Sequence, residues 1–331
     1  MNNTLPMLTL AQMLRERARQ HPARIAIRQK DFGIWQGITW DDYYRRSSHV
    51  GLGLRALGLS AGGHVGVIAE NRIEWVLTQM GCGLVGGIAV GVYPTSPSPE
   101  VAYVLNHADV EVVVCEDQEQ TDKVVEALDQ LPHLRAIVVM ETKGLRSADE
   151  RVRDRILSFA DLETLGVEYE ATHRHLVEQT LAAQRLEDIA LMIYTSGSTG
   201  KPKGAMISYA NIRGVAPGIA DRLGLSADTS HLSYLPLCHV AEQMLTTFCP
   251  IYLGSTVAFG ESIRTVQEDL REIAPTMFLG VPRIWEKLHS AISIKMQESG
   301  ALQRWLFARA MAACAPFAHK AAAQRTAGER L

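Results

Sequence analysis

Short apolar runs alternate with amphipathic stretches through the first half of the chain, and this pattern limits the fold more than any other feature of the sequence. Apolar runs of this length are typical of strands buried on both faces, as the strands of parallel sheets are. The stretches between them have helical spacing. The pattern therefore predicts an α/β fold with a largely parallel sheet. We expect strands at 65–69, 89–93, 111–115, 136–140 and 189–193, with helices at 73–83, 99–107 and 120–130.

A second alternation follows residue 204, and the N-terminal part adds a hairpin. The turn at Asp31-Phe32-Gly33 predicts pairing of 25–28 with 37–39, flanked by helices at 8–21 and from Thr39 to about 57. Residues 141–185 are charged and poorly periodic, which indicates surface structure with a helical patch at 173–184. We expect further helices from Tyr209, from Ala241 and around 263–273, and strands at 231–235, 256–259 and 276–279. The chain is thus predicted to form two similar α/β subdomains, 1–185 and 186–300, followed by a helical tail, 301–331.

The composition excludes several classes of function. With 331 residues, 47% of them hydrophobic, the chain can form a large core, and a net charge of −3 argues against a general nucleic-acid binder. The N-terminus has no charged and apolar leader, and the uncharged stretch 76–93 is interpreted as a buried helix and strand in preference to a membrane span. We expect a cytoplasmic protein, because the five cysteines lack zinc or disulfide spacing: Cys82, Cys115, Cys238, Cys249 and Cys314.

Residues 194–204 read Tyr-Thr-Ser-Gly-Ser-Thr-Gly-Lys-Pro-Lys-Gly and follow the apolar run at 189–193. Glycines let backbone N–H groups approach a polyanion, hydroxyl groups donate to phosphate oxygens or bind Mg²⁺, and lysines supply positive charge. The loop is not a Walker A element, because Pro202 stands after Lys201 where that motif needs Ser or Thr. A merely flexible polar turn would not require this set of residues. The loop therefore predicts a nucleoside triphosphate site, formed by Thr195, Ser196, Gly197, Ser198, Thr199, Gly200, Lys201, Lys203 and Gly204.

This loop resembles the signature of the adenylate-forming superfamily, which includes acyl-CoA synthetases, luciferases and the adenylation domains of peptide synthetases. The family pattern is Tyr-Thr-Ser-Gly-Thr/Ser-Thr-Gly-x-Pro-Lys-Gly, and the chain matches it throughout. Two further segments, 234–242 (Tyr-Leu-Pro-Leu-Cys-His-Val-Ala-Glu) and 279–287 (Leu-Gly-Val-Pro-Arg-Ile-Trp-Glu-Lys), are similar to segments of long-chain acyl-CoA synthetases. The resemblance extends from about residue 8 to about residue 300 and implies the two-subdomain N-terminal domain of these enzymes.

The resemblance also implies a reaction. A fatty acid carboxylate attacks the α-phosphate of ATP, an acyl-adenylate forms with Mg²⁺ present, and coenzyme A then displaces AMP. Carried over residue by residue, Lys201 and Lys203 act on the phosphates, His239 lies beside the reacting acid, and Ser198 helps to hold Mg²⁺. Phosphoryl chemistry of this kind needs charge neutralisation more than acid–base groups.

Other positions of the resemblance leave alternatives open. Glu242 either contacts His239 or begins the next helix, and Arg283 and Trp285 either line the acyl or adenine side or serve packing. Tyr209 stands where the family usually has His, so no polar role is carried over to it. We expect the remaining candidate histidines to be solvated: His107, His133 and His175.

The chain lacks the later motifs of the family, namely Tyr-Gly-x-Thr-Glu, Thr-Gly-Asp and the small C-terminal domain with its catalytic lysine. We therefore interpret it as the N-terminal portion of a long-chain fatty acid–CoA ligase, truncated before that domain, which a separate chain could supply. The chain alone is then either active or inactive, and the sequence leaves both alternatives open. The alternatives are a non-catalytic nucleotide-binding or interaction module, and an adenylating enzyme for another carboxylate or acceptor. The basic, apolar segment 301–320 predicts either an amphipathic helix at the inner membrane surface or a helix packed on the body of the protein.

Overall fold

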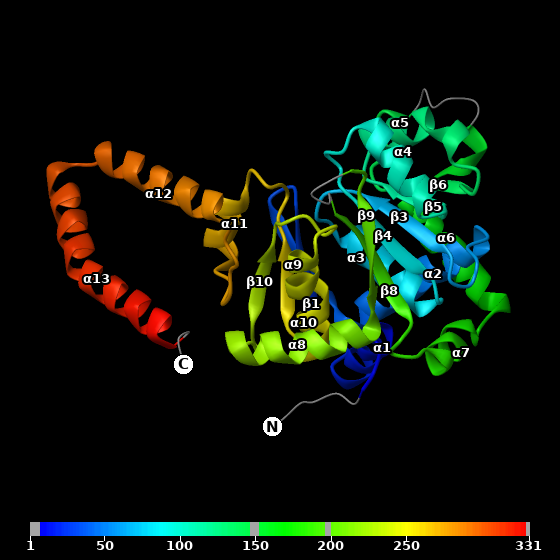
Figure 1. Cartoon of the computed structure of the whole chain (residues 1–331), viewed down its shortest axis with the longest axis horizontal. Helices are drawn as coiled ribbons and strands as arrows, with labels where there is room; N and C mark the ends of the chain where they lie inside the picture. Colours follow the sequence, from blue (N-terminus) through cyan, green and yellow to red (C-terminus); the bar gives the residue numbers. More distant parts are fainter. Residues whose placement is uncertain (1–6, 146–151, 196–199, 329–331) are drawn as a thin grey trace. The chain divides into compact units, whose positions relative to one another are not determined.

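The computed structural model describes residues 7–145, 152–195 and 200–328, in which strands alternate with helices (Figure 1). The chain forms two compact units, Met1–Met277 and Phe278–Leu331. The strands are β1 (Ile25–Asp31), β2 (Ile34–Thr39), β3 (His64–Ile68), β4 (Ile88–Val92), β5 (Val110–Cys115), β6 (Ala136–Val139), β7 (Ile156–Ser158), β8 (Ile189–Thr195), β9 (Lys203–Ser208), β10 (Ser230–Ser233) and β11 (Thr256–Phe259). The helices are α1 (Leu10–Gln20), α2 (Trp40–Ala56), α3 (Ile73–Leu84), α4 (Ser98–His107), α5 (Gln118–Glu126), α6 (Phe159–Thr172), α7 (Leu176–Ala183), α8 (Tyr209–Leu223), α9 (Val240–Gln243), the π-helical η4 (Met244–Phe248), α10 (Cys249–Leu253), α11 (Val266–Ile273), α12 (Pro282–Gln297) and α13 (Ala301–Gly328).

The larger sheet has the strand order β7-β6-β5-β3-β4-β8-β9. Its strands pair in parallel from β7 to β8, and β9 joins as an antiparallel edge strand. This confirms the parallel α/β arrangement that the sequence predicts. The stretch 76–93 lies within α3 and β4, as a helix followed by a strand. None of the helices in the described ranges is long and apolar enough to cross a bilayer.

Helices cover both faces of the larger sheet, which explains why its strands are apolar on both sides. Alternate residues of β5 face different clusters: Val112 and Val114 pack with residues of α2, α3 and α6, whereas Val113 and Cys115 pack with residues of α4 and α5. The cluster that contains Val112 also includes Ile27 of β1. One continuous core therefore joins the two sheets.

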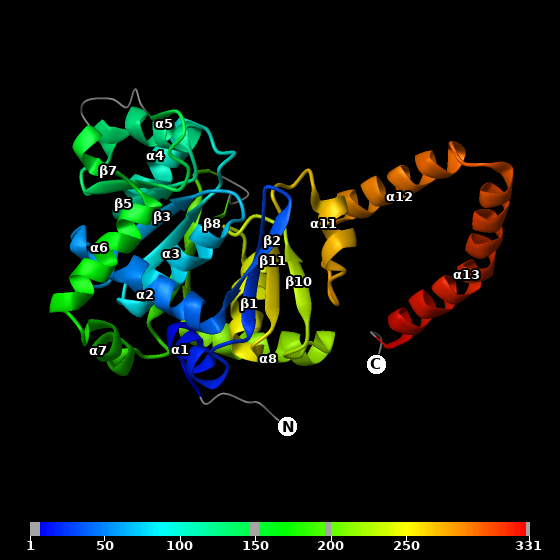
Figure 2. The same ribbon diagram turned by 180° about the vertical axis from the view of Figure 1, so that it is seen from behind.

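The smaller sheet has the order β10-β11-β1-β2, so strands from the two ends of the first unit pair with each other (Figure 2). β1 and β2 form the predicted hairpin, with Phe32 and Gly33 at positive φ in its turn. β8 and β9, which follow residue 185, pair within the larger sheet. Each sheet thus contains strands from both sides of that residue, and the subdomain boundaries at 185 and 300 stay predictions.

The segment 141–185 contains more structure than its irregular pattern indicates. It holds β7, which joins the larger sheet, and two helices, α6 and α7. A Cβ atom at Gly53 of α2 would lie 2.2 Å from the carbonyl oxygen of Leu162, and one at Gly166 of α6 would lie 1.8 Å from that of His49. The backbones of α2 and α6 therefore touch, and the interpretation of this segment as surface structure alone is wrong.

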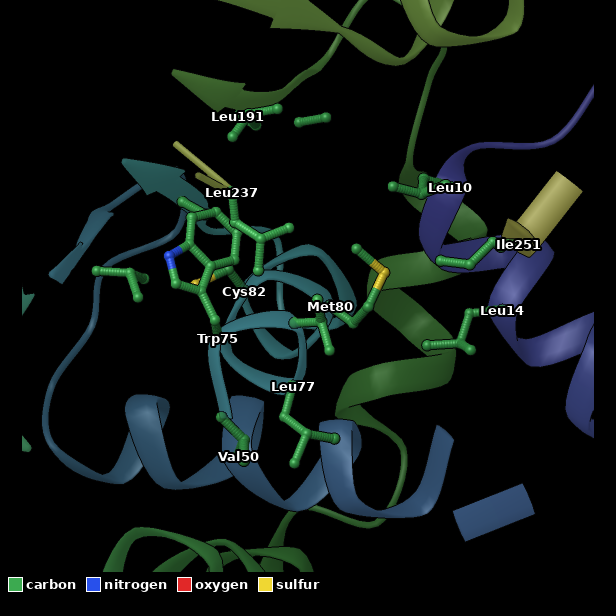
Figure 3. Packing of buried hydrophobic residues seen from close by; sticks show 14 of the residues in the cluster. Leu10, Leu14, Val50, Trp75, Leu77, Met80, Cys82, Leu191, Leu237 and Ile251 are labelled. Carbon is green, nitrogen blue, oxygen red and sulfur yellow. The ribbon is translucent and has the colours of Figure 1, made fainter. Parts of the chain in front are cut away.

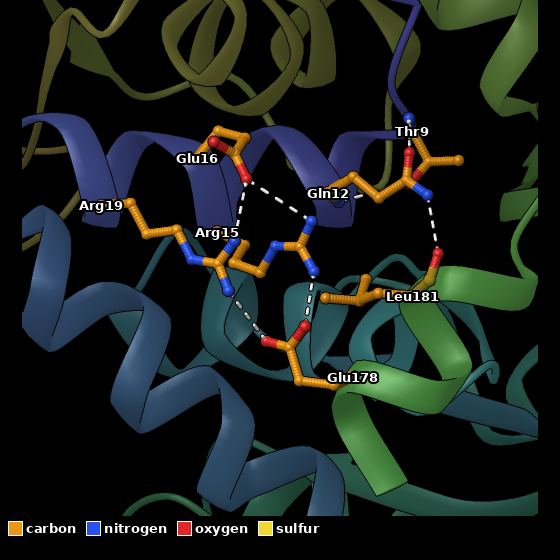
Figure 4. A network of polar contacts seen from close by, with 7 residues as sticks. All are labelled: Thr9, Gln12, Arg15, Glu16, Arg19, Glu178 and Leu181. Atoms are coloured by element: carbon orange, nitrogen blue, oxygen red, sulfur yellow. Dashed lines mark hydrogen bonds and ion pairs between the residues drawn. The ribbon is translucent and has the colours of Figure 1, made fainter. Parts of the chain in front are cut away.

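Polar contacts attach the N-terminal helix to α7 (Figure 4). Gln12 Nε2 donates to the carbonyl of Leu181 at 2.7 Å, and Arg15 Nη1 lies 2.6 Å from a carboxylate oxygen of Glu178. Thr9 caps α1 and also donates to Gln184 Oε1 at 2.7 Å. These contacts connect the start of the chain to the segment that precedes β8.

Two predictions near the C-terminal end of the described chain need correction. The strand expected at 276–279 is reduced to an isolated bridge between His231 and Met277. In α13 the exposed apolar side chains do not share one face, because Leu302 and Met311 are nine residues apart, which at about 100° per residue places them on opposite sides of the helix. The amphipathic pattern expected for 301–320 is therefore absent from the described side chains of this helix.

Candidate functional site

The candidate phosphate loop is the turn of a β-hairpin at the edge of the larger sheet. β8 and β9 pair antiparallel, with Thr195 opposite Lys203 and Tyr194 opposite Gly204. Gly200 has a φ of 105°, which side-chain-bearing residues rarely adopt. Lys201 precedes β9 and Lys203 is its first residue, and both are exposed. The predicted residues Ser196, Gly197, Ser198 and Thr199 lie outside the described residues.

Helix α4 contacts the second half of this turn through Tyr103. The Tyr103 hydroxyl donates to the carbonyl oxygen of Pro202 at 3.1 Å. The Nζ atom of Lys201 lies 5.0 Å from the centre of the Tyr103 ring, in cation–π geometry. Tyr103 therefore orders the part of the loop that carries its first lysine.

A second aromatic residue holds the start of the hairpin. Tyr194 is 4% exposed, and burial raises the pKa of its hydroxyl to about 12. The hydroxyl therefore stays protonated at neutral pH and can donate to His107 Nδ1, which lies 2.7 Å away. His107, His133 and His175 are exposed, as predicted for them, but the sequence did not reveal this contact of His107.

The hairpin and His239 line the same cavity, whose volume is about 480 Å³. Thr195 and Pro202 form part of its wall, and His239 contributes from the segment that joins β10 to α9. Residues of β4, of the turn before α4, of α4 itself and of β8 complete it: Gly91, Val92, Tyr93, Thr95, Ser96, Pro97, Glu100, Val104 and Tyr194. The structure thus brings two predicted regions together, although 35 residues lie between Lys203 and His239 in the sequence.

His239 is exposed and stands at the N-terminus of α9. Its Nδ1 atom accepts a hydrogen bond from the backbone N–H of Ala241 at 3.2 Å, so in the neutral ring the proton is on Nε2. A ring in this state can donate to a carboxylate or phosphate oxygen. The neighbouring thiol is not a candidate nucleophile, because burial raises the pKa of Cys238 to about 12.

The prediction that Glu242 could contact His239 is wrong for the side chain. Glu242 is fully buried, its Oε1 atom accepts from the Thr246 hydroxyl at 2.6 Å, and the same oxygen lies 3.6 Å from His231 Nε2. Glu242 belongs to α9, in agreement with the alternative that it begins the next helix. Its carboxylate therefore contributes to the interior beneath the site and not to the cavity wall.

The structure gives the other predicted positions local contacts. Tyr209 is buried at the start of α8, and burial raises the pKa of its hydroxyl. Trp285 belongs to the second compact unit, where its Nε1 atom donates to the carbonyl of Gly280 at 2.8 Å. The proposed roles of Arg283 and Trp285 near a ligand stay predictions.

A larger cavity, of about 560 Å³, lies beyond the carboxyl ends of β1, β3, β5 and β11. Its cationic residues have carboxylate partners: Lys30 Nζ lies 3.1 Å from Asp269, and Arg72 Nη1 lies 3.6 Å from Glu116. Lys201 and Lys203 have no carboxylate within ion-pair distance among the described residues. We therefore place the candidate anion site at the smaller cavity, beside the hairpin.

The described residues include only part of the predicted Mg²⁺ site. Within the ranges that the structure describes, no three or more His, Cys, Asp and Glu residues gather in a way that could hold a metal ion. The predicted ligand Ser198 is outside those ranges. Magnesium is commonly held by substrate phosphates and one or two oxygen ligands, and Thr195 and Glu100 are described residues of the cavity with oxygen to offer.

Tyr103 supplies the first testable prediction. Replacement of Tyr103 by Leu removes the ring beside Lys201 and the hydroxyl that holds Pro202, so the loop must be ordered at the expense of binding energy. We expect the Kd for MgATP, measured by calorimetry, to rise about fivefold to thirtyfold, since the two contacts together contribute about 1–2 kcal/mol. Tyr103→Phe keeps the ring and should show a smaller increase. Unchanged affinity in Tyr103→Leu would contradict a role in ordering the loop.

Comparison with protein families finds a match to the AMP-binding enzyme family over residues 14–330. Among curated proteins, the chain is 30% identical to the long-chain-fatty-acid--CoA ligase ACSBG2 of Xenopus laevis over 308 residues, which cover 91% of this chain and 41% of that protein. It is also 30% identical to the Homo sapiens protein of the same name, over 91% of this chain and 44% of the relative. The chain thus spans less than half the length of these curated relatives.

Solved structures share the fold at lower identity. A long-chain-fatty-acid-CoA ligase from Archaeoglobus fulgidus superposes with a TM-score of 0.70 at 20% identity, over 89% of this chain and 55% of that one. The A domain of a carboxylic acid reductase from Segniliparus rugosus, solved with AMP and a carboxylic acid, gives a TM-score of 0.74 at 18% identity, over 92% of this chain and 54% of that one. At these identities the likeness establishes the fold alone.

Proposed function

This chain belongs to the AMP-binding enzyme family, and on that premise we propose that it takes part in the ATP-dependent activation of a long-chain fatty acid and its transfer to coenzyme A. The kind of reaction, an acid–thiol ligation through an adenylate, is supported by the curated relatives and their names. The particular acid and the activity of this chain are proposals, because the chain spans less than half of those relatives.

The observation that carries the proposal is the shared cavity of the hairpin and His239. A carboxylate can attack a phosphate only if both are held next to each other, which requires an acid site adjacent to a phosphate site. Thr195 and Pro202 stand at one side of the cavity and His239 at another. A polar histidine, with apolar residues such as Val92 and Val104 in the same wall, suits an acid with a carboxylate head and an aliphatic chain.

In this scheme the residues act by position and charge. Lys201 and Lys203 neutralise the phosphates, so that the acid oxygen can form its bond to the α-phosphorus while the bond to pyrophosphate breaks. His239 donates from Nε2 to a carboxylate oxygen and keeps the acid at the cavity. Bound Mg²⁺ would add positive charge at the phosphates. The thiol of coenzyme A would then take the acyl group, and AMP would leave.

Exchange of labelled pyrophosphate into ATP tests the first half-reaction. We expect exchange that depends on both MgATP and palmitate, and less exchange with a short acid such as acetate. Binding of MgATP without exchange would instead support a non-catalytic nucleotide-binding module. Exchange that depends on an unrelated carboxylate, with palmitate inert, would support an adenylating enzyme for another acid.

Replacement of His239 gives a prediction for the acid side of the cavity. His239→Ala removes the proposed donor to the carboxylate, so we expect the KM for palmitate in the exchange assay to rise about tenfold, as for loss of one hydrogen bond to a charged group. The Kd for MgATP should stay within a factor of about two. His175→Ala, at an exposed histidine outside the cavity, is the matched control. If His239→Ala raises the Kd for MgATP by the same factor as the KM for palmitate, the residue does not act specifically on the acid.

A further inference from the structure

We propose that three amide side chains, Asn71, Gln79 and Gln243, form a clamp that fixes the backbone of Leu235–Leu237 and thereby positions His239 at the cavity. The inference rests on the proposed function only for the statement that this position serves the acid. None of the three lines the cavity beside the hairpin, although Asn71 lines the larger cavity. They are therefore positioning residues and not catalytic ones.

Asn71 follows β3 and uses both ends of its amide. Its Nδ2 atom donates to the carbonyl of Leu235 at 2.6 Å and to the Ser233 hydroxyl at 2.8 Å. Its Oδ1 atom accepts the backbone N–H of Leu237 at 3.1 Å. A residue at the carboxyl end of the larger sheet thus holds the chain that leaves β10 of the smaller sheet.

Gln243 of α9 holds the other side of Leu237. Its Nε2 atom donates to the Leu237 carbonyl at 2.7 Å, so both backbone polar groups of Leu237 are bound by side-chain amides. The Oε1 atom of Gln243 in turn accepts from Gln79 Nε2 and from the Thr247 hydroxyl, each at 2.8 Å. Gln243 and Gln79 are 0% and 2% exposed, so these contacts have little competition from water.

The need for such a clamp follows from the packing of this segment. Residues 234–239 form neither helix nor strand, yet Leu237 is fully buried and belongs to the same apolar cluster as Trp75 (Figure 3). Irregular backbone in a core must find partners for its polar groups, or each unpaired group carries a desolvation penalty. On the cavity side the segment rests against β4, where a Cβ atom at Gly91 would lie 2.9 Å from the Cα of Cys238. The segment is therefore held from two sides directly before His239.

Cys238 reports the state of this segment directly. It is 2% exposed and lies between Leu237 and His239, so a maleimide can reach its thiol only if the segment moves. Three further cysteines, Cys82, Cys115 and Cys249, are buried elsewhere, and Cys314 is exposed. Labelling of all five therefore separates a local opening from global unfolding.

The decisive variant is Asn71→Asp, which keeps the shape and the acceptor but removes the N–H donors and sets a carboxylate against the Leu235 carbonyl. We expect N-ethylmaleimide to label Cys238 about tenfold faster than in the unmodified protein, as measured by peptide mass spectrometry over time. Labelling of Cys82, Cys115 and Cys249 should not change. Asn211→Asp is the matched control, because Asn211 Oδ1 accepts from the backbone N–H and hydroxyl of Ser208, which aspartate does equally well.

A milder variant covers the case in which Asn71→Asp unfolds. Gln79→Met keeps the length of the side chain and removes an Oε1 atom that lacks a hydrogen-bond partner among the described residues, so its folding should be preserved. It also removes the donor to Gln243, and Cys238 labelling should rise about threefold. If Asn71→Asp labels Cys238 at the original rate, the clamp is refuted. If Asn71→Asp accelerates all buried cysteines together and Gln79→Met leaves Cys238 unchanged, the amides hold the fold as a whole and the clamp is likewise refuted.

Enzyme kinetics test whether the clamp affects use of the acid. In palmitate-dependent pyrophosphate exchange, Gln79→Met should raise the KM for palmitate by about threefold and leave the Kd for MgATP unchanged. Faster Cys238 labelling with an unchanged KM would overturn the link between this segment and the acid. Absence of exchange in the unmodified protein would count against the proposed function, whereas the labelling result would still decide whether the clamp exists.

Discussion

Replacement of both Lys201 and Lys203 by alanine is expected to weaken MgATP binding by about a hundredfold or more. Each ammonium group bound to a phosphate contributes about 1.5–3 kcal/mol, and the described residues place no carboxylate near either side chain to offset its charge. Because both lysines are exposed, we use the lower end of that range. Isothermal titration calorimetry at fixed ionic strength measures the effect.

The control for this double variant is Lys287→Ala with Lys295→Ala, which removes the same charge at exposed positions outside the hairpin and outside both cavities. The control should bind MgATP like the unmodified protein if binding depends on position and not on net charge. Equal losses of affinity in the two double variants would show a general electrostatic effect. Unchanged affinity in Lys201→Ala with Lys203→Ala would refute the hairpin as the phosphate site.

The sequence predicted the larger sheet well because its signal is local. Strands buried on both faces must be apolar throughout, and β3, β4, β5, β6 and β8 all begin and end within a few residues of the apolar runs. Strand order is a different matter, since it depends on which strands meet in space. Nothing in the pattern of 25–39 indicates that β1 pairs with β11, more than 200 residues further along the chain.

Site residues could be predicted where one short sequence motif contains them. They could not be predicted where folding alone brings them to the site. The hairpin residues and His239 are found from motifs, and two of them, Thr195 and His239, lie in the same cavity. Tyr103 could not be found in this way, because a tyrosine on an amphipathic helix has no distinctive pattern and its contact with Pro202 exists only in the folded chain. Asn71 left one weak signal, a polar residue two positions after the apolar run 65–69.

Helix α6 shows why an irregular sequence can hide close packing. Contact between two helical backbones needs glycine, and glycine carries no hydrophobic signal. Gly166 of α6 lies over the His49 carbonyl of α2, and Gly53 of α2 lies over the Leu162 carbonyl of α6. In the sequence, Gly166 is only a small residue in a charged stretch, whereas in the structure it lies in the contact between α2 and α6.

Replacement of Gly166 by alanine is therefore expected to destabilise the protein by about 3 kcal/mol. The new Cβ atom would lie 1.8 Å from the His49 carbonyl oxygen, whereas real Cβ contacts are essentially never under 3.0 Å, so the two helices must move apart. Overpacking of this kind typically costs about 1–3 kcal/mol and occasionally more, and here the obstacle is backbone that cannot rotate away. Urea unfolding followed by circular dichroism gives the free energy of unfolding from the midpoint and slope.

Gly214 provides the matched control for that variant, because it is also a glycine inside a helix. It lies in α8 with no atom within 4 Å of a Cβ added there, so Gly214→Ala should stabilise the protein by roughly 0.5–1 kcal/mol through helix propensity. The same substitution thus has opposite signs at the two sites, and the difference isolates the α2–α6 contact. If Gly166→Ala is as stable as Gly214→Ala, then α2 and α6 do not touch through their backbones, and α6 packs more loosely than the structure indicates.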